Sequence, residues 1–100
     1  MNPHEISLQE AKEMTHAYQN EPTFQGLTVS CKIGKEAYQE LMNQDGCAGV
    51  RTYFAKNESG KLTIVVVGVD DNGNDMTDGV LLNRALLCPN ACPTNSSLII

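Results

Sequence analysis

The chain has 100 residues, a net charge of −5 and no tryptophan, which fits one small domain with a thin, mainly aliphatic core. Its seven lysines and arginines are scattered from Lys12 to Arg84, which argues against nucleic-acid binding, because phosphate binding needs clustered basic side chains. The longest apolar run, Leu62 to Val69, is far shorter than the roughly 20 residues of a membrane-spanning helix, so a membrane partner is not predicted either.

The N-terminal residues 1–5 have neither the basic region nor the apolar stretch of a signal peptide. Four cysteines in 100 residues do not make a disulfide-dense chain. The sequence therefore predicts a cytoplasmic protein, in which thiols are reduced by default.

Residues 8–19 form the first predicted helix. Its start is marked by a capping box, Ser7-Leu8-Gln9-Glu10, in which the serine hydroxyl accepts from the glutamate amide. Apolar side chains then recur at helical spacing and predict one apolar face: Leu8, Ala11, Met14 and Tyr18.

A short strand and a second helix are predicted next. Residues 27–33 alternate in a way that favours a strand with Cys31 facing the core. Residues 35–43 carry apolar side chains at helical spacing, and Asp45-Gly46 supplies the signal that ends the helix.

Two further strands are predicted over residues 50–55 and 62–69, joined by a turn. The first strand places Phe54 on one face and Arg51 and Tyr53 on the other. The second is apolar at consecutive positions, so we expect it to be central and covered on both faces. Three residues are expected in the core: Phe54, Val65 and Val67.

Asn72-Gly73 predicts a type I′ hairpin turn with positive φ at both residues, followed by a polar edge strand over residues 74–77. Residues 80–87 fit either a helical turn or a strand. The predicted class is α+β, with two helices packed on a small three- to four-stranded, mainly antiparallel sheet. Residues 1–87 form this domain, and residues 88–100 form an irregular Cys/Pro tail.

The tail carries the most informative motif, Cys88-Pro89-Asn90-Ala91-Cys92-Pro93. Each proline fixes its own φ and keeps the preceding cysteine out of a helix, so both thiols lie on stiff backbone. The spacing misses the Cys-x-x-Cys pattern of thioredoxins and zinc knuckles by one residue. A metal pair for copper or zinc, a local disulfide and a rigid docking turn all remain open for Cys88 and Cys92.

These six residues resemble the Cys-Pro-x-x-Cys-Pro copper site of the chaperones that assemble cytochrome oxidase. Just seven residues follow Pro93 here, where that family places its thioredoxin fold, so we do not expect the chain to belong to that family. A broader resemblance, carried by residues 45–54, 62–75 and the Cys-Pro tail, is to a group of small uncharacterised bacterial proteins. It implies a compact α+β unit with a thiol tail and implies no activity or cofactor.

Candidate side chains outside the tail are few. Arg51 and Tyr53 face outward on one strand and are candidate partner-binding residues. The apolar end Leu98-Ile99-Ile100 is either a disordered tail or a segment that adds to a partner sheet. Four carboxylates around one predicted hairpin are interpreted as solvated turn residues: Asp70, Asp71, Asp75 and Asp78.

Cys31 and Cys47 are each expected to be small buried hydrophobes, unless the tail folds back on them to make a four-thiol metal site. No set of nucleophile, base and oxyanion donors can be assembled, so an enzyme is not predicted. The sequence predicts a non-enzymatic module for protein interaction or self-association, with the Cys-Pro tail as its docking or locking element. The alternative is a thiol-based metal or redox module that uses Cys88 and Cys92.

Overall fold

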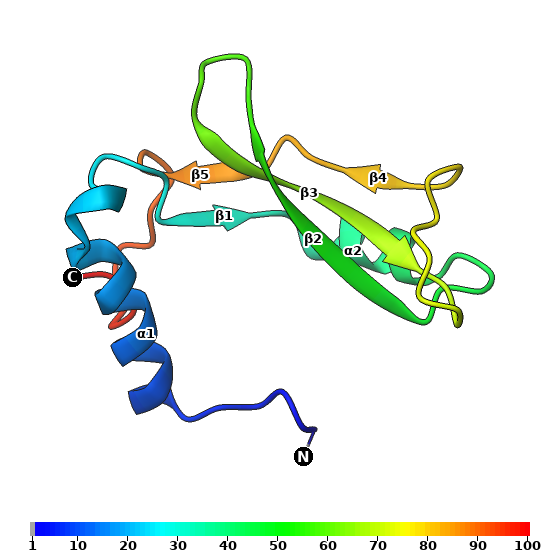
Figure 1. Ribbon diagram of the computed structural model, residues 1–100, viewed down its shortest axis with the longest axis horizontal. Coiled ribbons are helices and arrows are strands. Elements are labelled where there is room, and N and C mark those ends of the chain that lie inside the picture. The colour runs from blue at the N-terminus through cyan, green and yellow to red at the C-terminus, as the bar shows by residue number, and fades with distance from the viewer. Residues whose placement is uncertain (1) are drawn as a thin grey trace.

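The computed structural model describes residues 2–100, and in this part of the chain the predicted α+β class is confirmed. The elements follow in the order α1 (Leu8–Asn20), η1 (Pro22–Phe24), β1 (Ser30–Lys32), α2 (Lys35–Met42), β2 (Gly49–Lys56), β3 (Leu62–Val69), β4 (Leu81–Leu82) and β5 (Leu86–Cys88). The strands form two antiparallel sheets, β2-β3-β4 and β1-β5, rather than one (Figure 1). No helix within residues 2–100 is long and apolar enough to cross a membrane.

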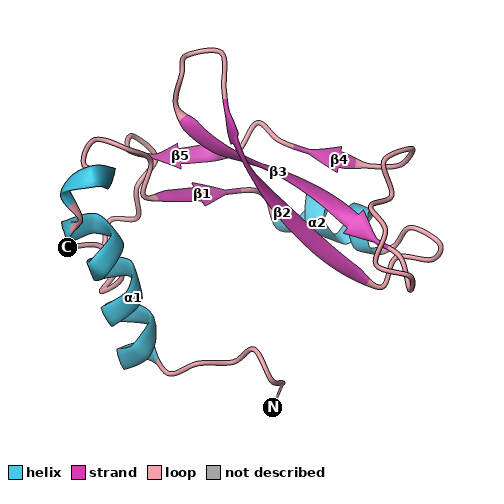
Figure 2. Ribbon diagram, viewed as in Figure 1, coloured by secondary structure: helices cyan, strands magenta, loops and turns pink. Residues whose placement is uncertain are grey.

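Helix α1 begins where the capping box predicts. The Ser7 hydroxyl accepts a hydrogen bond of 3.1 Å from the Glu10 amide, which satisfies one of the free amides of the first turn. The helix does not, however, pack its apolar stripe on a sheet: none of its residues is buried, and Leu8 and Met14 are each 62% exposed. Figure 2 shows α1 at one side of the molecule, away from the β2–β3 pair.

The register of β2 and β3 defines the two faces of the main sheet. Phe54 lies opposite Ile64, and Val50 opposite Gly68, so these four residues share one face, because alternate residues of a strand point to the same side. A side chain at Gly68 would meet Cys47 Sγ and Gln44 Nε2 at 3.1 Å each. The segment that follows α2 therefore covers this face at the Gly68 end, and Gly68 is needed for that close approach.

The core is small and centres on α2 and β3. Its buried apolar residues are Leu41, Val66, Val67 and Cys88. The prediction that Val67 is buried is confirmed, while Val65 is half-buried. The prediction for Phe54 is wrong: it is 83% exposed, because the segment after α2 covers this face at the Gly68 end and Phe54 lies toward the other end, opposite Ile64.

Two turns of the same design connect the strands. In the first turn, the side-chain amide oxygen of Asn57 accepts hydrogen bonds from two backbone amides. In the second, a carboxylate oxygen of Asp70 does the same. Gly60 and Gly73 each close the turn with a hydrogen bond to that residue's carbonyl and have positive φ. The type I′ prediction is wrong, since Asn72 does not share the positive φ; the Asp70 side chain stabilises a turn that needs it only at Gly73.

Past this turn, a single bridge between Val69 and Asp75 replaces the edge strand predicted over residues 74–77. The undecided segment 80–87 contributes strands to both sheets, β4 beside β3 and β5 beside β1. Between them, Asn83 donates from Nδ2 to the Ile64 carbonyl at 2.7 Å, and Arg84 has a φ of 53°. This left-handed residue lets the chain leave one sheet for the other.

The predicted strand over residues 27–33 is reduced to the three residues of β1. Its Cys31, expected to face the core, is half-buried, because β1 pairs only with β5 and not with the main sheet. β5 ends at Cys88, which lies opposite Ser30 in the register, so the tail starts from a residue that is itself paired in a sheet.

Candidate functional site

Cys88 and Cys92 form a disulfide, so of the three alternatives left open by the sequence the structure contains the bonded turn. Their Cα atoms are 4.7 Å apart, within the range that disulfides span. Cys88 is 2% exposed at the end of β5, whereas Cys92 lies in an exposed turn. In this state neither sulfur is a free thiolate for a metal.

Beyond the disulfide the tail returns to α1. The His16 ring donates from Nε2 to the Ser97 carbonyl at 3.0 Å, and the Gln19 side chain donates to the Leu98 carbonyl at 2.9 Å. The same Gln19 amide accepts from the Ile100 backbone amide at 3.1 Å. The C-terminal segment, predicted as either disordered or partner-binding, therefore lies along α1 and helps to fix that helix in place.

An open apolar groove lies between α1 and the end of the β2–β3 hairpin. Its volume is about 480 Å³. Met14 and Tyr18 come from α1, β1 contributes Cys31, and Phe54 and Ile64 come from the exposed end of the main sheet. The groove thus brings together the uncovered stripe of α1 and the uncovered end of the Phe54 face.

The groove is uncharged. Its lining contains no lysine, arginine, aspartate or glutamate: Met14, Thr15, Tyr18, Gln19, Thr28, Val29, Ser30, Cys31, Phe54, Leu62, Thr63 and Ile64. The Tyr18 hydroxyl is already paired, since it donates to the Thr28 carbonyl at 2.9 Å. Partial burial raises the pKa of the Cys31 thiol, which keeps it protonated and weakly nucleophilic at neutral pH. Such a lining suits apolar contact better than acid–base chemistry.

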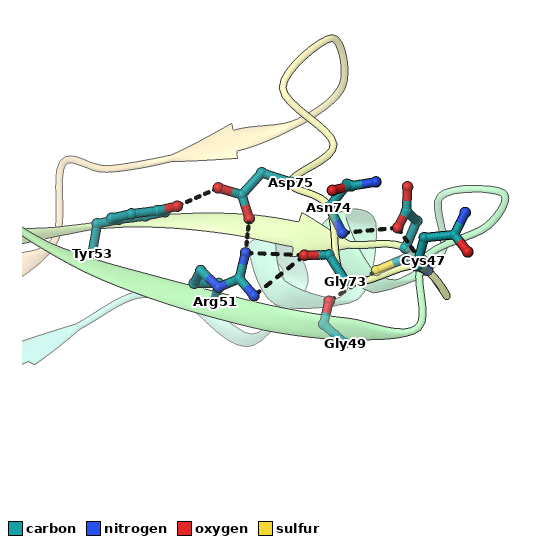
Figure 3. Close-up of polar contacts among 9 residues, drawn as sticks. Cys47, Gly49, Arg51, Tyr53, Gly73, Asn74 and Asp75 are labelled. Atoms are coloured by element: carbon teal, nitrogen blue, oxygen red, sulfur yellow. Dashed lines mark hydrogen bonds and ion pairs between the residues drawn. The ribbon is translucent and has the colours of Figure 1, made fainter.

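The predicted outward pair Arg51 and Tyr53 lies on the opposite face and converges on Asp75 (Figure 3). Arg51 donates to the Asp75 carboxylate at 2.5 Å and to the Gly73 carbonyl at 3.4 Å, while the Tyr53 hydroxyl donates to the other Asp75 oxygen. The Tyr53 hydroxyl and then the Arg51 guanidinium hold the pKa of Asp75 below its ordinary value. Arg51 and Tyr53 thus use polar atoms to fasten the 70–75 loop to β2.

The fourth cysteine, Cys47, takes no part in the disulfide or the groove. The Cys47 thiol donates to the Gly49 carbonyl at 3.3 Å. Among residues 2–100 no three or more histidine, cysteine, aspartate or glutamate side chains gather as a metal site, so the four-thiol arrangement is not formed. Of the four predicted turn carboxylates, Asp70 stabilises its turn and Asp75 forms the ion pair.

The chain exposes more surface than a compact domain of its mass. Its accessible surface is 7509 Å², whereas about 5,600 Å² is typical of a folded monomer of 10.9 kDa. Its radius of gyration is 15.1 Å, against about 13 Å for a compact domain of this length. The excess of about 1,900 Å² includes large apolar side chains such as Phe54, Leu8 and Met14.

Sequence reasoning identified the cysteine pair but missed the groove. The alternating pattern of β2 marked Phe54 as a core residue, and the helical spacing marked Met14 and Tyr18 as a packed face. Both signals were real, since each marks an apolar surface that needs a cover. Comparison of the chain with protein-family models, curated proteins and solved structures finds no match, so the resemblance to small bacterial proteins stays a prediction.

Proposed function

We propose that this protein is a small, non-enzymatic interaction or assembly module that binds another protein surface through its apolar groove. The observation that carries the proposal is the exposure of Phe54, at 83%, beside a groove without charged side chains. Monomeric proteins rarely leave a large contiguous apolar surface in water, and such surfaces mark sites of protein association.

The tail serves this module as a lock on α1. Its contacts with His16 and Gln19 hold one wall of the groove, and the disulfide fixes the backbone from which the tail departs. In this proposal the apolar end Leu98–Ile100 acts within the chain, by positioning α1, as well as at the edge of the bound partner. Arg51 and Tyr53 keep their proposed contact with a partner only at the rim, because Asp75 occupies their polar atoms.

The proposal is tested by isolating native complexes from cells that express the tagged chain. Phe54→Ser is compared with Leu81→Ser, because Leu81 is 54% exposed and lies opposite Val67, on the other face of the sheet. We expect the wild type and Leu81→Ser to recover one stoichiometric complex, homomeric or heteromeric, and Phe54→Ser to lose it. Monomeric recovery of all three chains would refute the interaction function.

A second candidate function rests on the disulfide itself. A pair with one buried and one exposed cysteine can be opened from the Cys92 side, where a dithiol reductant supplies two electrons and two protons to give two thiols. In the cytoplasm, the location proposed from the sequence, the bond would be transient, and the reduced pair could hold copper or zinc. About one metal equivalent bound by reduced protein and lost in Cys88→Ser would favour this function over the first.

A further inference from the structure

We infer that the partner at the groove is a second copy of this chain, in a two-fold dimer in which Phe54 of each copy enters the groove of the other. This inference rests on the proposed interaction function and names its partner. It follows from the shape of one face of the molecule, from the area left exposed and from the charge of the groove.

The shape of this face suits a two-fold interface. Such an interface uses the same patch on both copies, so the patch must hold a projecting group and a receiving surface side by side. Phe54, 83% exposed, is the projecting group, and the groove beside it is the receiving surface. Met14 and Tyr18 on the α1 wall offer the thioether and ring contacts that an incoming phenyl group favours.

The exposed area suits a dimer that forms as part of folding. A standard interface with an independently folded partner buries about 800 Å² on each side, whereas obligate homodimers bury roughly 2,000–5,000 Å² in total. The excess of about 1,900 Å², counted over the whole surface of the chain, is well above the first value and lies within the per-copy share of the second. The small buried core points the same way, because obligate partners complete one another's core.

The charge of the groove permits a like-charged partner. The chain carries a net charge of −5, so two copies repel at long range. Because the groove lining holds no charged side chain, bringing two copies together there buries no unpaired charge. A strongly basic partner would instead be expected to bind a surface with carboxylates, and none lies in the groove.

The test is the oligomeric state of the purified 100-residue chain, measured by sedimentation velocity and light scattering from about 1 µM to about 1 mM, a range that covers weak and tight dimers. We expect a dimer whose dissociation constant rises about a thousandfold in Phe54→Ser, since each dimer loses two aromatic anchors. Met14→Ser, on the facing wall, should weaken the same dimer, and Leu81→Ser, on the other face, should not. Circular dichroism checks that each variant is folded.

Hydrogen exchange provides a second measurement that does not depend on a variant. Amides of residues 14–19 and 62–64 should gain protection as the protein concentration rises through the dimer range. A chain that stays monomeric throughout, or a dimer that is unchanged by Phe54→Ser, overturns the two-fold dimer. If the monomeric chain still forms a Phe54-dependent complex with a different protein, the dimer fails while the interaction function stands.

Discussion

Replacing Leu41 by alanine tests whether the small core around α2 and β3 holds the fold together. Leu41 in α2 and Val66 in β3 are both 0% exposed, and these two elements are in contact. Truncating a buried leucine costs about 2–5 kcal/mol, from the lost transfer of its methyl groups and the cavity left behind. The total free energy of unfolding of a 100-residue domain is roughly 5–15 kcal/mol, so this one change removes a large share of the stability.

The matched control is Met42→Ala, the next residue in the same helix, which is 49% exposed. Leucine and methionine have similar helix propensities, so the difference between the two variants reports burial rather than helix formation. At about 4–8 °C per kcal/mol, a loss of about 2–5 kcal/mol in Leu41→Ala should lower the melting temperature by roughly 8–40 °C. Urea unfolding at one fixed protein concentration measures the free energy of unfolding of the two variants. Equal losses of stability in Leu41→Ala and Met42→Ala would show that α2 does not pack on the core through Leu41.

The remaining predictions concern contacts that join distant segments. Gln44→Ala should cost about 1–3 kcal/mol by thermal unfolding, because the Val80 amide loses an acceptor at 2.8 Å, while the exposed Gln39→Ala should change little. The pKa of Asp75 is lowered in the folded chain, so the stability that its carboxylate contributes is present above its unfolded pKa and is lost as pH falls through the folded pKa. The difference in unfolding free energy between wild type and Asp75→Asn should therefore shrink in acid. A difference that stays constant down to pH about 2 would contradict the ion pair. Cys92→Ser should lower stability by about 2 kcal/mol at most, since the loop it closes is very short, and reductant should shift the wild-type midpoint equally.

Local signals in the sequence placed most of the elements correctly. The Ser7 cap sets the start of α1, and the glycines at the ends of the turns set where strands stop, because these effects act within a few residues. The type I′ assignment failed within the same range, since the Asp70 side chain competes with the backbone pattern that Asn72-Gly73 favours. Residues 80–87 were too short and too evenly apolar for any periodicity to separate helix from strand.

The order of apolar and polar residues in the chain establishes which surfaces are apolar, whereas contacts between distant segments establish which of these surfaces are covered. Val66 and Phe54 lie on the same face of the sheet and were both part of apolar strand patterns, yet Val66 is 0% and Phe54 83% exposed. The difference depends on where α2 and the segment after it meet the sheet, a contact between residues far apart in the chain. The pairing of Cys88 with Cys92 was likewise one of several chemistries that the motif allowed until the fold brought the two sulfurs together. The periodicity of apolar residues shows that a face is favourably buried away from water. Which surface covers that face depends on long-range packing, within the chain or between two chains.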